Sequence, residues 1–143
     1  MVKVKILSDG VDAPKLNVDL LQGWIEAVAR LYGRGVGEIS YIFCNDEKIL
    51  EVNRQYLEHD YYTDIITFDY SRPKRISGDM FISLDTVASN AVLVNSAYRD
   101  ELLRVVIHGV LHLCGIKDKS KSEREAMESA ENQALRMLPS DIL

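Results

Sequence analysis

The chain has 143 residues, of which 47% are hydrophobic and 27% charged, with a net charge of −5. This length suits one domain that buries roughly two thirds of its unfolded surface, so folding needs no disulfide framework. No apolar run approaches the ~20 residues of a membrane span, and the N-terminus lacks the apolar segment of a signal peptide. We therefore expect a single domain over residues 1–143, located in the cytoplasm. The acidic balance argues against nonspecific coating of nucleic acid but allows a local basic patch.

Hydrophobic periodicity and turn residues divide the chain into strands and helices. β-branched, aromatic or alternating residues predict strands at residues 2–7, 39–44, 65–70 and 80–84. Helical spacing predicts helices at residues 20–32, 46–57, 85–95, 97–114 and 122–138. Asn17 or Asp19 can cap the first helix, Asp85 or Thr86 the third, and Ser122 with Glu125 fits a capping box for the last. The third and fourth strands should pair antiparallel across the connection 71–79.

Together these elements predict an α+β domain, with a mixed sheet of about four strands packed against about five helices. The most informative stretch, His108 to Asp118, lies at the end of the central helix. His108 and His112 are four residues apart, so their imidazoles project from one helix face. Gly115 can take the positive φ that ends a helix, which lets the chain turn and bring Asp118 back toward the histidines.

Two imidazoles and one carboxylate suit zinc, although the same ligands can hold another divalent metal such as iron, manganese or nickel. Three protein ligands leave an open position for water, as in catalytic zinc sites. The alternative to a metal site is a purely structural role, in which His112 packs under the final helix and Asp118 caps that helix. Cys114 lies about 140° around the helix from the histidines, so we expect it to face the core. A protease is disfavoured, because Gly109 stands where His-Glu-x-x-His enzymes carry their glutamate base.

Several segments also match the motifs of one family in order and spacing, from about Ile39 to the end of the chain. His108–Gly115 looks like His-Gly-x-Leu-His-Leu-x-Gly, and residues 60–68 look like Asp-x-Pro-Thr-Asp-Val-Leu-Ser-Phe. Asn-Arg-Gln-Tyr at residues 53–56 and Gly-Asp at residues 78–79 support the match. The chain thus resembles the YbeY family of metal-dependent endoribonucleases, also described as rRNA maturation factors.

The resemblance implies zinc bound by His108, His112 and Asp118, which act in catalysis through the metal-bound water. It also implies processing of the 3′ end of the small-subunit rRNA and ribosome quality control. The expected partners are rRNA in the small ribosomal subunit, ribosomal proteins and assembly factors, with neither DNA nor a membrane involved. The chain departs from the family at three positions: the family commonly has histidine at Asp118, arginine at Leu57 and proline at Tyr62.

RNA binding requires basic side chains near the metal. Three groups are candidates, although ordinary solvated surface is the more common interpretation of each group taken alone. They are Lys117, Lys119 and Lys121 after the ligand turn, Arg72, Lys74 and Arg75 between two strands, and Arg104 one turn before His108. His59, in the polar stretch 58–64, could contact phosphate or transfer a proton, although a plain exposed histidine is the simpler interpretation.

The sequence therefore predicts a metal-dependent endoribonuclease that cleaves single-stranded RNA in rRNA processing. A metal suits this reaction, because it can polarise a phosphoryl oxygen and activate water without a carboxylate base. The alternative is a non-catalytic ribosome-assembly factor, in which the metal is structural and the basic groups only bind RNA or a ribosomal protein.

Overall fold

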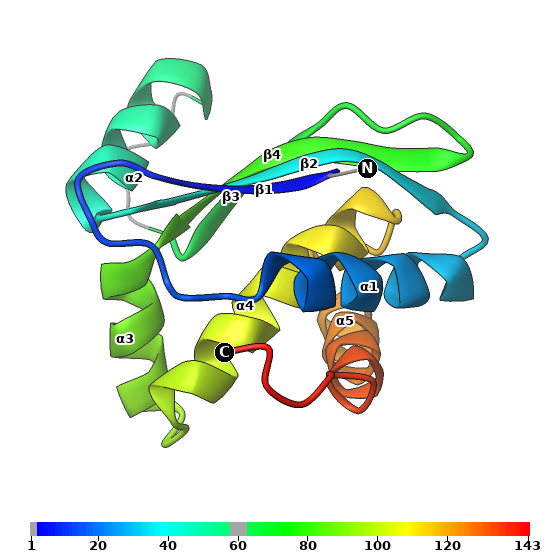
Figure 1. Cartoon of the computed structure of the whole chain (residues 1–143). Helices are drawn as coiled ribbons and strands as arrows, with labels where there is room; N and C mark the ends of the chain where they lie inside the picture. Colours follow the sequence, from blue (N-terminus) through cyan, green and yellow to red (C-terminus); the bar gives the residue numbers. More distant parts are fainter. Residues whose placement is uncertain (1–2, 58–62) are drawn as a thin grey trace.

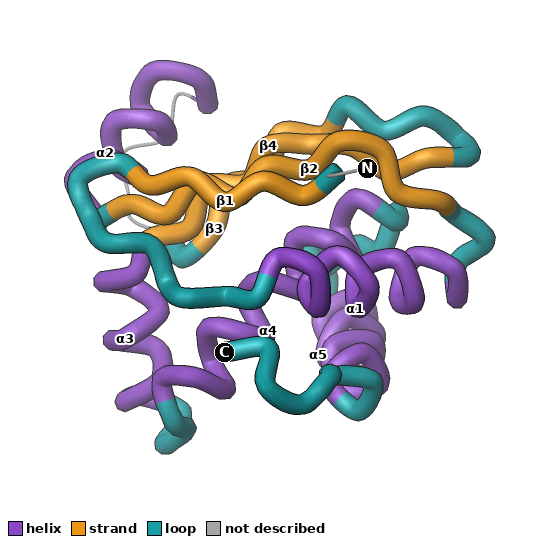
Figure 2. Tube along the Cα trace, viewed as in Figure 1, coloured by secondary structure: helices purple, strands orange, loops and turns teal. Residues whose placement is uncertain are grey.

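The protein is an α+β domain in which a four-stranded sheet lies over a layer of helices (Figures 1 and 2). The computed structural model describes residues 3–57 and 63–143. The strands are β1 (Val4–Ser8), β2 (Gly35–Cys44), β3 (Ile65–Asp69) and β4 (Arg75–Ser83). The helices are α1 (Val18–Leu31), α2 (Asp46–Val52), α3 (Leu84–Leu93), α4 (Tyr98–Leu113) and α5 (Lys121–Leu135), with a π-helical turn η1 (Asn53–Leu57) after α2. The predicted fold class is confirmed.

The sheet is mixed and has the strand order β1-β2-β4-β3. Strands β1, β2 and β4 are parallel, and β3 pairs antiparallel with β4, as predicted. Two strands begin earlier than predicted, β2 at Gly35 and β4 at Arg75. Glycine and aspartate, which occur in these added stretches, have weak strand propensity, so pairing with neighbouring strands decides their conformation. The connection between β3 and β4 therefore shortens to residues 70–74, and β3 lies at the sheet edge.

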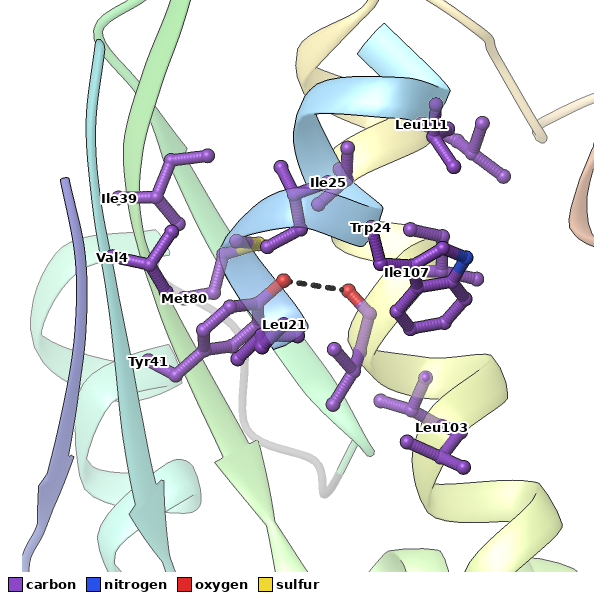
Figure 3. Close-up of a cluster of buried hydrophobic side chains, with 14 of the residues drawn as sticks. Val4, Leu21, Trp24, Ile25, Ile39, Tyr41, Met80, Leu103, Ile107 and Leu111 are labelled. Carbon is purple, nitrogen blue, oxygen red and sulfur yellow. Dashed lines mark hydrogen bonds between the residues drawn. The ribbon is translucent and has the colours of Figure 1, made fainter. Parts of the chain in front are cut away.

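The core lies between the sheet and helices α1, α4 and α5 (Figure 1). Figure 3 shows Ile25 of α1 facing the sheet, while Trp24 of α1 lies beside Ile107 of α4, between the two helices. Tyr41 on β2 donates its hydroxyl hydrogen to the Val106 carbonyl at 2.9 Å, which ties α4 to the sheet (Figure 3). The residues predicted to face the core from α4 are all buried; they are Leu102, Val105, Val106 and Leu113. No helix in the described residues is long and apolar enough to span a membrane.

The cap of α5 differs from the prediction in a way that matters for the site. Ser120 accepts a hydrogen bond from the Glu123 N–H, and the Glu123 carboxylate accepts one from the Ser120 N–H. The pattern Ser-x-x-Glu occurs twice in this stretch, at 120–123 and at 122–125, so sequence alone could not choose between them. Because Ser120 caps α5, the alternative that Asp118 serves as the cap is wrong.

Two other predicted boundaries are corrected. Ser83 caps α3, accepting from the Thr86 N–H at 3.3 Å, where Asp85 or Thr86 was expected. The helix predicted at 46–57 is regular only as far as Val52 and continues as the π-helical turn η1. Single-turn π segments are rare in helices and frequently occur at functional sites.

Gly78→Ala is expected to lower the free energy of unfolding by about 1–3 kcal/mol, because overpacking in a buried position strains its neighbours. A Cβ at Gly78 would lie 2.5 Å from the Phe68 carbonyl oxygen and 3.0 Å from Leu113. Urea denaturation measures the change. Gly23→Ala is the matched control: a Cβ there meets nothing within 4 Å, and alanine should stabilise α1 by roughly 0.5–1 kcal/mol. Unchanged stability of Gly78→Ala would contradict this tight packing.

Candidate metal centre

Three predicted ligands converge at the end of α4. His108 and His112 lie one turn apart, with ring centroids separated by 4.6 Å and ring planes at 84°. Gly115 has φ of 101°, the left-handed conformation expected at the end of this helix. The chain then turns back, so that Asp118 Oδ2 lies 3.4 Å from His108 Nε2 and 3.3 Å from His112 Nε2.

The donor atoms of these three residues fit a metal ion. One ligand atom from each lies within 4.8 Å of the other two, and all three side chains are half-buried. Among residues 3–57 and 63–143, these three side chains form the one cluster of His, Cys, Asp or Glu that could hold a metal ion. Cys114 is partly buried and packs against the core, as expected. Metal binding by His108, His112 and Asp118 stays a prediction, which this geometry supports.

A fourth residue, Glu131 of α5, holds one of the histidines in place. Its Oε2 lies 2.6 Å from His108 Nδ1, and its Oε1 accepts a hydrogen bond from Arg104 at 2.8 Å. When Nδ1–H donates to a carboxylate, the Nε2 lone pair is free and the ring orientation is fixed, as in many histidine ligands of metals. Glu131 therefore directs the Nε2 atom of His108 toward Asp118.

The sequence contains a signal for Glu131 that motif analysis missed. The predicted apolar stripe of the last helix includes Met127 and Ala134, and Glu131 falls on the same stripe, four residues after one and three before the other. Its side chain is only 11% exposed. A carboxylate on the buried face of a helix needs a charged or hydrogen-bonding partner. Its position alone does not identify the partner as His108.

The charges around the site favour a cation. Burial by itself would lower the pKa of His108, but the hydrogen bond to Glu131 and the negative charges of Glu131, Asp64 and Asp118 raise that pKa overall. Burial would likewise raise the pKa of Glu131, but its hydrogen bonds to His108 and Arg104 lower it overall. Carboxylates thus surround the two imidazoles, and a bound cation would balance the excess negative charge.

A cleft of about 420 Å³ separates the three predicted ligands from the edge strand β3. The β3 wall contributes Ile65, Ile66, Thr67 and Asp69, and the remaining lining residues are Asn53, Thr63, Asp64, His108, His112 and Asp118. Burial raises the pKa of Asp64, and the nearby His108 opposes this shift. Thr63 and Asp64 thus line the cleft next to the start of β3.

Two of the predicted RNA-binding lysines lie beside the ligands. Lys117 and Lys119 line a hollow of about 340 Å³ together with His112 and Asp118. Lys121 is the first residue of α5. These positions are compatible with phosphate binding, which stays a prediction.

The arginines lie in two different places. Arg34 donates to the Arg72 carbonyl at 2.7 Å and to the Cys114 carbonyl at 3.5 Å, so it joins the β3–β4 turn to the end of α4. Arg72 and Arg75 close that turn by backbone hydrogen bonds, with Lys74 between them. Arg104 instead binds Glu131 and Asn132 and lines a separate hollow beside His108. His59 lies outside the described residues.

Comparison with known proteins identifies the family. The family model for the endoribonuclease YbeY matches residues 10–139. The chain belongs to the endoribonuclease YbeY family. Endoribonuclease YbeY of Parabacteroides distasonis is 59% identical over 134 residues, covering 94% of each chain. That of Phocaeicola vulgatus is 63% identical over 131 residues, covering 92% of this chain and 95% of the relative.

A solved structure has a similar fold. The solution structure of a protein from Thermotoga maritima superposes with a TM-score of 0.61 at 26% sequence identity, covering 96% of this chain and 97% of that one. The family resemblance drawn from the histidine motif and the upstream segments is therefore confirmed.

Glu131→Gln is expected to weaken zinc binding about 10- to 100-fold, the usual effect of removing the carboxylate that orients a histidine ligand. Glutamine keeps the shape of the side chain but loses the charge that holds His108 Nδ1. Competition with a chromophoric zinc chelator measures the affinity. Glu125→Gln, an exposed position on the same helix, is the control and should bind zinc like the native chain. Native affinity in Glu131→Gln would show that this contact does not support the metal site.

Proposed function

We propose that this member of the YbeY family is a zinc-dependent endoribonuclease that hydrolyses single-stranded RNA in the cleft between α4 and β3. One observation carries the proposal: His108, His112 and Asp118 bring three ligand atoms within 4.8 Å of one another at the wall of an open cleft. Three protein ligands leave room for water or substrate, the arrangement of catalytic zinc. We assign the activity to one domain over residues 1–143.

His108, His112 and Asp118 would hold the metal. A zinc ion bound there would activate water and offset negative charge at the phosphate, without a carboxylate base. Glu131 fixes the ring of His108, and Arg104 in turn holds Glu131 at 2.8 Å. Arg104 thus acts on the site through Glu131, even though it was selected as a possible RNA contact.

Lys117 and Lys119 are the basic side chains that we assign to the phosphates on either side of the cleaved bond. They share a hollow with His112 and Asp118, so a phosphate held there would lie beside the metal ligands. Lysine suits this role as a flexible point charge that needs no fixed geometry. Leu57 carries no positive charge where the family commonly has arginine, so phosphate binding depends more heavily on these lysines.

The proposed substrate is ribosomal RNA, near the 3′ end of the small-subunit RNA. Its partners would then be the small ribosomal subunit, ribosomal proteins and assembly factors, in the cytoplasm where ribosomes are assembled. The relatives named above are called endoribonucleases, which supports RNA cleavage. A purely structural metal in a non-catalytic assembly factor is disfavoured, because structural zinc is normally enclosed by four protein ligands.

His112→Ala is expected to abolish zinc binding and to reduce RNA cleavage by about a thousandfold, equivalent to several kcal/mol of lost transition-state stabilisation. Removing the metal from the native chain with a chelator should have the same effect, and added zinc should restore cleavage. A labelled precursor rRNA substrate reports the rate. Cys114→Ala is the control, since this partly buried neighbour should retain both zinc and activity. Cleavage that persists in His112→Ala and after chelation would refute the proposal.

Replacing Lys117 and Lys119 together by alanine is expected to weaken RNA binding and its dependence on salt. Each phosphate contact with single-stranded RNA contributes about 0.7 to the slope of log affinity against log salt, so losing two should reduce the slope by about 1.4. Fluorescence anisotropy over a salt series measures it. Lys5→Ala is the control, because β1 lies at the opposite edge of the sheet from β3. An unchanged slope in the double variant would place the phosphates elsewhere.

A further inference from the structure

The outer edge of β3 faces the cleft with backbone groups that β4 does not use. Among the strands of the described residues, β3 pairs with β4 alone. The Asp64 carbonyl accepts from the Ser83 N–H at 2.9 Å, and the Tyr70 N–H donates to the Ser77 carbonyl at 2.9 Å. Hydrogen-bonded and non-bonded pairs alternate along an antiparallel ladder, so the even-numbered residues between these two pairs also bond β4. The odd-numbered residues direct their N–H and C=O groups outward; they are Ile65, Thr67 and Asp69.

Ile65, the first of these residues, already has a hydrogen-bond partner within the chain. The Ile65 carbonyl accepts a hydrogen bond from the Thr63 hydroxyl at 3.5 Å. Within residues 3–57 and 63–143, no hydrogen bond reaches the outward backbone groups of Thr67 or the N–H of Asp69. Both residues line the cleft that contains the predicted metal ligands. A short row of donors and acceptors is therefore available there.

The charges of the cleft determine how an RNA strand would lie in it. Asp64 and Asp69 place carboxylates at the two ends of the β3 wall, which repels phosphates from that wall. Lys117 and Lys119 lie beyond the predicted ligands, in the adjoining hollow that also contains His112, Asp118 and Glu123. A single strand would therefore run with its phosphates toward the lysines and the predicted metal ligands and with its bases toward β3. The edges of unpaired bases carry the donors and acceptors that such a wall can bind.

We propose that the open backbone edge of β3 at Thr67 and Asp69 binds the base edges of the nucleotides next to the cleaved phosphate. This inference rests on the endoribonuclease function proposed above and assigns base recognition to one wall of its cleft. An extended peptide could pair with the same edge by strand addition. The carboxylates beside β3 and the lysines beyond the predicted ligands favour RNA, because they separate a base side from a phosphate side.

Amide hydrogen exchange in the zinc-loaded native chain tests the proposal directly. The probe is a short single-stranded 2′-O-methyl oligonucleotide, which binds without being cleaved, and the control is the same backbone with abasic positions. Exchange at Thr67 and Asp69 should slow about tenfold or more at saturation. Ile66 and Phe68, already bonded to β4, should not change. Equal protection by the abasic probe, no protection by bound RNA, or protection only by a basic peptide would overturn the assignment.

Thr67→Pro provides an independent test, because proline removes the outward N–H and is tolerated on an edge strand where no ladder bond is lost. It should weaken binding of the intact oligonucleotide roughly three- to tenfold, the effect of one hydrogen bond, and leave binding of the abasic one unchanged. Thr67→Val keeps the backbone and should bind both like the native chain. Equal losses on both probes would refute base recognition by this edge.

The two proposals fail in different ways. If the zinc-loaded native chain cleaves no RNA, the endoribonuclease function fails, and amide exchange with the uncleavable probe still decides the role of β3. If the native chain cleaves RNA while exchange at Thr67 and Asp69 is unaffected by the bound probe, only the base-recognition proposal fails. Amide exchange uses the native chain, so it decides the question even if Thr67→Pro does not fold.

Discussion

Helix α4 lies directly on the sheet at Gly109, where a side chain would collide with Met80 Sδ. Gly78 of β4 allows a similar approach near the end of the same helix. The close packing of α4 on the sheet places His108 and His112, on the flank of α4, beside the edge strand β3. A larger residue at either glycine would push the helix away and widen the cleft. Both the convergence of the ligands and the wall opposite them therefore depend on close packing between a helix and a sheet.

The same packing explains why the motif differs from that of metal-dependent peptidases. Position 109 would carry the glutamate base of His-Glu-x-x-His, but here it is buried against the sheet. A glutamate would have to bury its carboxylate next to Met80, which is costly without a partner. The glycine that allows α4 to approach the sheet thus also removes the base, and the chemistry must rely on groups that face the cleft.

Sequence analysis predicted the parts of the site that depend on local spacing. His108, His112 and Asp118 lie within eleven residues, so helix periodicity and one glycine turn were enough to bring them together. Glu131 comes from another helix, 23 residues after His108, and only tertiary packing pairs them. The start of β4 and the cap of α5 were misplaced for a related reason: strand pairing overrides weak propensity, and two overlapping capping patterns are indistinguishable without the structure.

The contacts of His108 with two carboxylates would link its protonation to the binding of a metal. Nδ1 of His108 faces Glu131 at 2.6 Å, while Nε2 lies 3.4 Å from Asp118. When both nitrogens are protonated, Nε2–H faces Asp118; the hydrogen bond to Glu131 and the negative charges of Glu131, Asp64 and Asp118 favour this charged form and raise the pKa of the imidazole despite its burial. A metal at Nε2 would replace that second proton and leave the bond to Glu131 intact. A proton and a metal would therefore compete for one nitrogen, and a carboxylate at position 118 would stabilise whichever positive charge is bound there.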